Sequence, residues 1–325
     1  MMEKAVLEVV NLRTELRSRR GLVRAVDGVS LHISEGETLG LVGESGSGKS
    51  ITAMSIARML PQPAGTIVGG EVRLDGEDLV AKSASEMRSV RGRLIGTILQ
   101  DPMSSLNPVF SVGQQIGDAI SAHASSDRTE IRKETTRLLD MVRIPSAAAR
   151  APSFPHQLSG GMRQRVVGAI ALASKPRLLI ADEPTTALDV TVQAQYLALL
   201  RDLQKQLGLA ILMITHDFGV VAATCHRVAV MYAGRIVEQA PVEDLFEKPR
   251  HPYTEALLAP LRTGRQPRKS VLPSLSGQPP DLRDPPKGCR FAARCPKVMP
   301  RCVEAYPPET LHQPGHTSNC WLHVE

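Results

Sequence analysis

The chain has 325 residues, of which 42% are apolar, 22% charged and 3% aromatic, and its formal net charge is +6. This length and apolar share allow one large core or two domains, and they exclude a disordered or collagen-like chain. No apolar run reaches the ~18 residues that a membrane-spanning helix requires, and the N-terminal residues lack the apolar block of a signal peptide. We therefore expect a cytosolic, soluble protein.

Composition changes sharply after Lys248. Residues 249–325 hold 11 Lys and Arg against 6 Asp and Glu, together with 14 of the 24 prolines and four of the five cysteines. This shift predicts a near-neutral globular domain followed by a basic extension that prolines interrupt.

A phosphate-binding loop is predicted near the N-terminus. Residues 38–42 form a short apolar run typical of a buried strand, and residues 51–60 have helical apolar spacing. Between them the sequence fits G-x-x-x-x-G-K-[ST], in which backbone N–H groups surround phosphate oxygens. Lys49 is expected to reach the β and γ phosphates, and the Ser50 hydroxyl to bind Mg²⁺. The predicted nucleotide contacts from this loop are Gly43, Glu44, Ser45, Gly46, Ser47, Gly48, Lys49, Ser50 and Ile51.

Polar residues at the ends of three further apolar runs complete the predicted site. Asp182 ends the run 178–181 and is expected to hold Mg²⁺, and Glu183 is the candidate general base for the attacking water. His216 follows the run 210–214 and is a candidate for sensing the γ-phosphate. Gln100 follows the run 94–99 and is expected to reach Mg²⁺ or the attacking water.

The octet at residues 158–165, LSGGMRQR, resembles the signature motif of ATP-binding cassette (ABC) ATPases. A serine and two glycines open a predicted helix here, which makes a second anion site that the P-loop of the same chain does not need. The resemblance covers nearly all of residues 5–258. It implies that Asp189 lies in a D-loop along a dimer seam, and that the signature contacts ATP held by the opposite subunit through Ser159, Gly160, Gly161 and Met162.

Three further segments, 100–108, 110–115 and 154–159, are similar to the dipeptide/oligopeptide (and nickel) importer ATPases. The resemblance implies an α/β fold with a P-loop NTPase core whose sheet is mostly parallel, an N-terminal antiparallel β subdomain and a helical subdomain at about 101–170. The expected domains are an ABC ATPase domain at 1–258 and a cysteine-containing C-terminal extension at 259–325.

The same resemblance implies an ATP-hydrolysing subunit that energises import of di- or oligopeptides. Its implied partners are a second ABC ATPase, which the Met162 signature suggests is unlike this chain rather than a copy of it, two membrane-spanning permease subunits and an extracytoplasmic solute-binding protein. We expect a peripheral location on the cytoplasmic face of the inner membrane and no nucleic acid partner. The alternatives are an importer of another solute, such as a nickel complex, or a soluble ABC ATPase acting on ribosomes or DNA; the sequence does not reveal the cargo.

Adenine recognition lacks the aromatic residue expected before the P-loop, because all ten aromatic residues lie at or after Phe110. Arg20 falls near the position expected for that residue. Its guanidinium plane, or the apolar Val26, is the candidate to cover the base.

Four cysteines in the extension, Cys289, Cys295, Cys302 and Cys320, follow the pattern C-x5-C-x6-C-x17-C. In a cytosolic chain, clustered cysteines suggest a metal rather than disulfides. Structural zinc favours cysteine pairs two to four residues apart, whereas these wide spacings suit an iron–sulfur cluster better. The resemblance implies a [4Fe-4S] cluster; zinc, packing cysteines and disulfides are the alternatives.

Overall fold

The computed structural model describes residues 5–99, 105–123, 127–262 and 275–324. The chain divides into two compact units built from interleaved segments. The helical unit comprises Met1–Leu7, Ile33–Thr38 and Arg73–Ile214, and the P-loop unit comprises Glu8–His32, Leu39–Val72 and Thr215–Glu325. The predicted domain division at residue 258 stays a prediction.

Parallel strands form the centre of the helical unit. Strand β7 (Leu178–Asp182) pairs with β6 (Ile95–Ile98) on one side and with β8 (Ala210–Thr215) on the other. Every residue of β7 and β8 is buried. Strands covered on both faces need apolar residues at every position, which explains the continuous apolar runs in the sequence.

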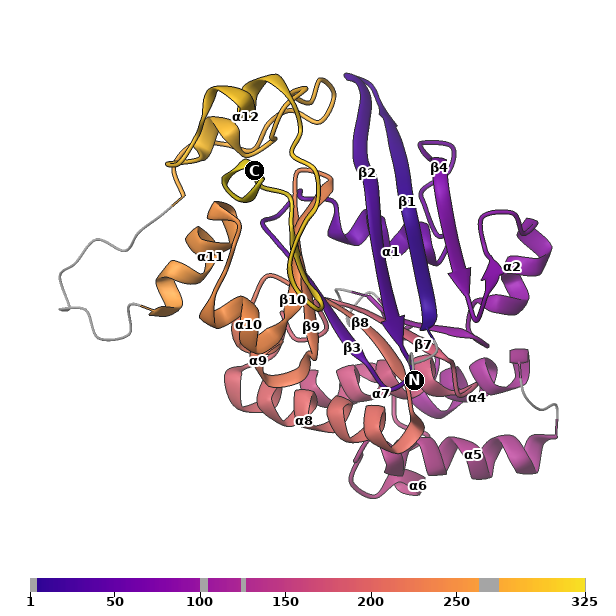
Figure 1. Cartoon of the computed structure of the whole chain (residues 1–325). Helices are drawn as coiled ribbons and strands as arrows, with labels where there is room; N and C mark the ends of the chain where they lie inside the picture. Colours follow the sequence, from indigo (N-terminus) through magenta and orange to yellow (C-terminus); the bar gives the residue numbers. More distant parts are fainter. Residues whose placement is uncertain (1–4, 100–104, 124–126, 263–274, 325) are drawn as a thin grey trace. The chain divides into compact units, whose positions relative to one another are not determined.

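Helices make up most of the rest of this unit. Helices α4 (Val112–His123), α5 (Arg128–Met141) and α7 (Gly160–Leu172) pack against one another (Figure 1). Ile116 and Ile120 of α4 and Leu138 and Leu139 of α5 are almost fully buried, as helical apolar spacing predicts. The other helical segments are α2 (Ala84–Val90), α6 (Ala147–Arg150), the 3-10 turn η1 (Pro155–Gln157) and α8 (Val190–Leu207).

Two long N-terminal strands begin the P-loop unit. Strands β1 (Ala5–Ser18) and β2 (Gly21–Ser34) are joined by a turn at Arg19 and Arg20, and β1 neighbours β4 (Gly65–Leu74) in the same sheet. The short β5 (Glu77–Asp78) pairs antiparallel with the end of β4.

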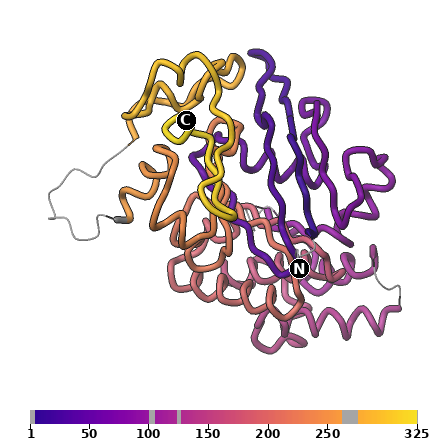
Figure 2. Tube along the Cα trace, in the orientation of Figure 1, coloured from indigo at the N-terminus to yellow at the C-terminus, as the bar shows by residue number. Residues whose placement is uncertain are grey.

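The extension adds strands to the second sheet of the P-loop unit. Strand β3 (Thr38–Val42) is parallel to β9 (Arg227–Tyr232), which pairs antiparallel with β10 (Arg235–Pro241). Two extension strands continue this sheet: β12 (His316–Ser318) pairs with β10, and β11 (Thr310–Gln313) pairs with β12. Figure 2 shows the C-terminal trace beside the β9–β10 hairpin.

An aromatic core joins the extension to the rest of this unit. Tyr232 at the end of β9, Tyr253 of α11 (Pro252–Arg262) and Phe291 of the extension are each at most 1% exposed, and their ring centroids lie 4.5–5.3 Å apart. The remaining helical segments are α1 (Lys49–Ile56), α9 (Phe218–Thr224), α10 (Val242–Glu247), η2 (Ala292–Arg294), α12 (Pro300–Glu304) and η3 (Trp321–His323). Within the described ranges, no helix has the length and apolarity needed to cross a membrane.

Candidate nucleotide-binding site

The predicted P-loop connects β3 to helix α1. Gly43, Gly46 and Gly48 have φ angles of +151°, +77° and +107°, in or near the left-handed region. A Cβ on Gly43 would lie 2.1 Å from the Met231 carbonyl oxygen, and one on Gly48 would lie 2.4 Å from the Ala25 carbonyl oxygen. Both positions therefore require glycine because neighbouring backbone approaches too closely for any side chain.

Lys49 lies inside the loop that it follows. Its side chain is buried, and Nζ donates hydrogen bonds to the carbonyl oxygens of Gly43 at 2.8 Å and Glu44 at 3.0 Å. The buried Ser47 hydroxyl has no hydrogen-bond partner in the part of the chain that the structure describes. A buried cation and an unpaired hydroxyl in a glycine-rich turn at a helix N-terminus fit a phosphate group and its bound Mg²⁺.

The carboxylates predicted for Mg²⁺ and for water activation lie in the helical unit. Asp182 is buried at the end of β7, and the next residue, Glu183, has the unusual φ of +47°. Thr186 Oγ1 donates to Glu183 Oε2 at 3.0 Å, and the Glu183 N–H donates to the Ile214 carbonyl at 2.9 Å. A left-handed non-glycine residue costs about 1–3 kcal/mol, and such strain is concentrated at functional sites.

Of the two remaining predicted polar residues, the structure places one. His216 follows β8 directly and is exposed. The next residue, Asp217, caps α9 by accepting the Gly219 N–H at 2.7 Å. Gln100 lies outside the described residues.

The signature and D-loop residues come together in the helical unit. Ser159 caps α7, and its hydroxyl accepts the Met162 N–H at 3.3 Å, while Asp189 caps α8 by accepting the Val192 N–H at 3.0 Å. A Cβ on Gly161 would lie 2.5 Å from Val192 Cγ1, so the two helix starts abut closely and any larger residue at Gly161 would require the Val192 side chain to move. Ser159, Gly160 and Asp189 are exposed and available to a partner molecule.

The two candidates for covering adenine differ in exposure. Arg20 is exposed in the β1–β2 turn, whereas Val26 is only 1% exposed. Arg20 is therefore the candidate with surface that a base could contact.

Tyr253 and Arg294 contact the P-loop, although no sequence motif indicates either residue. The Glu44 N–H donates to the Tyr253 hydroxyl at 2.9 Å, and the Arg294 guanidinium binds both oxygens of the Glu44 carboxylate at 2.7 and 3.0 Å. Both residues lie more than 200 positions from Glu44, so no local spacing pattern could indicate these contacts.

The four extension cysteines share one neighbourhood as free thiols. Cys302 and Cys320 are buried, Cys289 and Cys295 are half-buried, and the Cys289 N–H donates to the Cys302 carbonyl at 2.7 Å. Burial, together with the negative charge of the other three thiolates, raises the pKa of Cys289 to about 11. Over the described ranges, no three His, Cys, Asp or Glu side chains are arranged to hold one metal ion.

Comparisons with known proteins agree with this geometry. Residues 26–186 match the ABC transporter family, and residues 237–302 match the C-terminal region of oligopeptide/dipeptide transporters. The chain is 51% identical to a probable peptide ABC transporter ATP-binding protein, y4tR, of Sinorhizobium fredii, over 97% of this chain and 94% of that protein. It is 49% identical to the oligopeptide transport ATP-binding protein OppD of Bacillus subtilis, over 98% of this chain and 88% of that protein.

A solved structure supports the fold. The dimeric, post-hydrolysis structure of the ATP-binding cassette MJ0796 bound to ADP and Pi has a TM-score of 0.65 and 27% identity, over 73% of this chain and 98% of that one. This likeness confirms the predicted α/β P-loop NTPase fold. The chain therefore belongs to the ABC transporter ATP-binding proteins and, within them, to the group that carries the oligopeptide/dipeptide transporter C-terminal region.

Proposed function

We propose that this chain is the ATP-hydrolysing subunit of an ABC importer for di- or oligopeptides. The observation that carries the ATPase assignment is the P-loop, in which close backbone approach requires Gly43 and Gly48, and Lys49 is buried among loop carbonyls. The peptide assignment is supported by the match of residues 237–302 to the C-terminal region of oligopeptide/dipeptide transporters and by the relatives named for peptide transport. These relatives do not favour a soluble ATPase acting on ribosomes or DNA.

ATP would bind with its phosphates in the P-loop, where Lys49 exchanges its bonds to the Gly43 and Glu44 carbonyls for phosphate oxygens. Mg²⁺, held by Ser50, Asp182 and Gln100, would neutralise the developing negative charge. Glu183 then orients the attacking water, and His216 contacts the γ-phosphate. Positioning and electrostatic stabilisation supply most of the rate in phosphoryl transfer.

A second cassette would complete each ATP site. We assign Ser159, Gly160, Gly161 and Met162 to the ATP bound by that partner, and Asp189 to the dimer seam. Val190, next to Asp189, is 83% exposed and would be covered in such a seam. We infer an unlike ATPase as the partner, two permease subunits, an extracytoplasmic solute-binding protein, and a peripheral position on the cytoplasmic face of the inner membrane.

We further propose that the extension binds a [4Fe-4S] cluster through Cys289, Cys295, Cys302 and Cys320. The four cysteines lie close enough to influence the pKa of Cys289, and their wide sequence spacing suits an iron–sulfur cluster better than structural zinc. Anaerobic purification of the full chain should give a brown protein containing iron and sulfide, and Cys295→Ala should lose both. The matched control Cys225→Ala, which changes a cysteine outside the extension, should retain them. A colourless wild-type protein with stoichiometric zinc would refute the cluster.

The catalytic assignment is tested by ATP hydrolysis in the assembled complex. Glu183→Gln keeps the size of the side chain and removes the base, so turnover should fall to background when the partner's site is also inactivated. Thr186→Val is the matched control for the Thr186 Oγ1 to Glu183 Oε2 hydrogen bond and should retain most activity. Unchanged turnover in Glu183→Gln would refute its role as base.

A further inference from the structure

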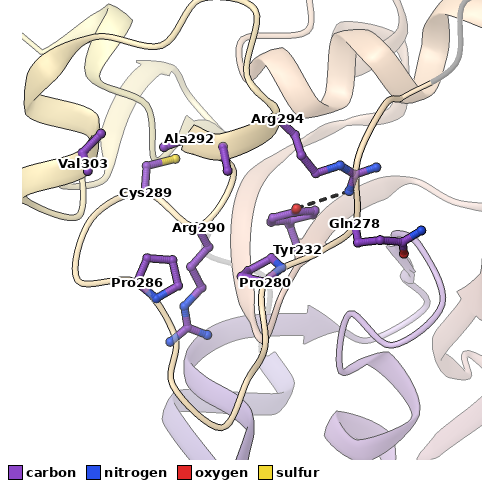
Figure 3. Close-up of a pocket in the computed structure, with 10 residues that line it drawn as sticks. Tyr232, Gln278, Pro280, Pro286, Cys289, Arg290, Ala292, Arg294 and Val303 are labelled. Carbon is purple, nitrogen blue, oxygen red and sulfur yellow. Dashed lines mark hydrogen bonds between the residues drawn. The ribbon is translucent and has the colours of Figure 1, made fainter.

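The extension reaches the P-loop through one arginine. The Arg294 side chain is 4% exposed, and its two terminal nitrogens bind both oxygens of the Glu44 carboxylate at 2.7 and 3.0 Å. Two further N–H groups are also used: Nε donates to the Ser276 carbonyl at 3.0 Å. Nη1 also donates to the Tyr232 hydroxyl at 3.2 Å (Figure 3). A buried, bidentate guanidinium with all these bonds holds its partner far more firmly than a surface ion pair does.

Glu44 is the residue at which several supports of the P-loop meet. Its N–H donates to the Tyr253 hydroxyl, and its carbonyl accepts from the Lys49 ammonium at 3.0 Å and from the Ser47 N–H at 3.2 Å. Phosphate binding would draw Lys49 away from that carbonyl. The bonds to Tyr253 and Arg294 would then hold Glu44 in place while the loop encloses the phosphates.

A second arginine of the extension supports the other side of the loop. Arg290, 4% exposed, donates to the Ala233 carbonyl and to the Asp27 carboxylate. Gly234, which follows Ala233 in the chain, donates its N–H to the carbonyl of the P-loop residue Ser47 at 2.7 Å. Figure 3 shows Arg290 and Arg294 extending in different directions from the same stretch of the extension, beside a cavity of about 250 Å³ that Cys289 also lines.

We propose that Arg294 is a positioning residue for nucleotide binding: by holding the Glu44 carboxylate, it keeps the start of the P-loop in the shape that receives the phosphates. The extension is then part of the nucleotide-binding machinery as well as a carrier of cysteines. Arg294 immediately precedes Cys295, one of the predicted cluster ligands. This role depends on nucleotide binding in the proposed function, but it does not depend on the transported solute.

The test is a titration of the purified full chain with Mg²⁺ and ADP, using the variants Arg294→Gln, Glu44→Gln and both together. Arg294→Gln should weaken ADP binding about tenfold, within the usual range of coupling between sites. Arg294→Lys keeps the positive charge but cannot bind both carboxylate oxygens at once, so it should weaken ADP binding less than Arg294→Gln does. In the Glu44→Gln background, Arg294→Gln should cause little further loss, because the carboxylate through which it acts is already gone. In the assembled complex, Arg294→Gln should raise the KM for ATP and leave kcat near that of the wild type.

The matched control is Lys297→Gln, which removes another cation of the extension. Lys297 Nζ pairs with Glu255 of α11 at 2.7 Å and not with Glu44, so ADP binding should stay at the wild-type value. Unchanged ADP binding in a folded Arg294→Gln variant, or an equal loss with and without the Glu44 carboxylate, would overturn the proposal. If Arg294→Gln does not fold, Arg294→Lys decides by the same criteria. Failure of the wild-type chain to bind ADP would instead refute the proposed function.

Discussion

Docking of the last strands of the extension depends on one buried carboxylate. Glu238 of β10 has a fully buried side chain that accepts hydrogen bonds from the backbone N–H groups of Arg250 at 2.7 Å and His251 at 2.9 Å. It also contacts His316 Nε2 of β12 at 2.8 Å, and His316 is 1% exposed. Glu238→Ala would therefore leave two backbone donors and an imidazole buried without their acceptor.

The expected cost follows from the number of groups left unpaired. Each unsatisfied buried donor costs about 1–3 kcal/mol, and three groups, the two backbone N–H groups and the His316 imidazole, lose their partner together. Because these losses overlap, we predict a loss of about 3–5 kcal/mol in the free energy of unfolding. Melting temperatures of large domains move by about 2–4 °C per kcal/mol, so the midpoint should fall by roughly 10 °C. Glu238→Gln keeps one acceptor oxygen and should cost less.

The assay is thermal unfolding together with limited proteolysis and mass spectrometry of the fragments. Glu238→Ala should melt earlier and be cut first within 305–324, where β11 and β12 lose their support. The matched control is Glu309→Ala, an exposed acid of the extension whose carboxylate accepts a long 3.4 Å bond from Thr317 Oγ1; it should behave like the wild type. A Glu238→Ala protein with wild-type melting and proteolysis would refute the assignment of docking to this carboxylate.

The pH dependence of Glu238 has a defined sign. Burial raises its pKa, but the hydrogen bonds from His316 and the two backbone N–H groups outweigh burial and hold the pKa below 4.5. A depressed carboxyl pKa means that the folded state binds its proton later than the unfolded state as the pH falls. The stabilisation by Glu238 is therefore complete above about pH 4.5 and is lost as pH falls through the lowered pKa.

Three further outcomes are expected. Gly43→Ala should abolish nucleotide binding because its Cβ would meet the Met231 carbonyl, whereas Gly46→Ala has open space around its Cβ and bears only the strain of its left-handed φ of +77°, so it should weaken binding less; equal effects in an equilibrium titration would contradict this account. Burial lowers the pKa of His251 to about 4, against an ordinary value of 6.5, so stability should fall by about 3 kcal/mol as pH drops between these values. Denaturant titrations should show this loss of stability in the wild type and a smaller loss in His251→Gln. If the stability of both proteins changed equally with pH, His251 would not be the group responsible. Asp189→Ala removes the cap of α8 and should cost about 1 kcal/mol, whereas Asp189→Asn should cost little; equal melting of the two would contradict the cap.

Local features of the site could be predicted from the sequence because they depend on neighbouring residues. The glycines around Gly43 and Gly48 mark a turn between a buried strand and a helix, and Ser159 and Asp189 precede helices as residues typical of an N-cap. The structure has the strand at Thr38–Val42, as predicted, whereas the helix spans Lys49–Ile56 and so begins and ends earlier than the predicted residues 51–60.

The long-range contacts could not be predicted because no periodic pattern encodes them. Arg294 meets Glu44 across 250 positions, and Glu238 meets His316 across 78. The interleaving of the two compact units likewise depends on strand neighbours distant in sequence, such as β3 with β9. The cysteine spacing indicated a shared neighbourhood, but the geometry of the four thiols depends on how the extension packs around Phe291.

The most direct test of the central claim is peptide uptake by the assembled complex in lipid vesicles, with ATP hydrolysis recorded in the same sample. We predict that di- or oligopeptide uptake requires ATP on the cytoplasmic side, that the peptide with its binding protein stimulates hydrolysis, and that Glu183→Gln, with the partner's site inactivated, abolishes both. Peptide uptake that continues in this variant, or hydrolysis that no peptide stimulates, would contradict the account.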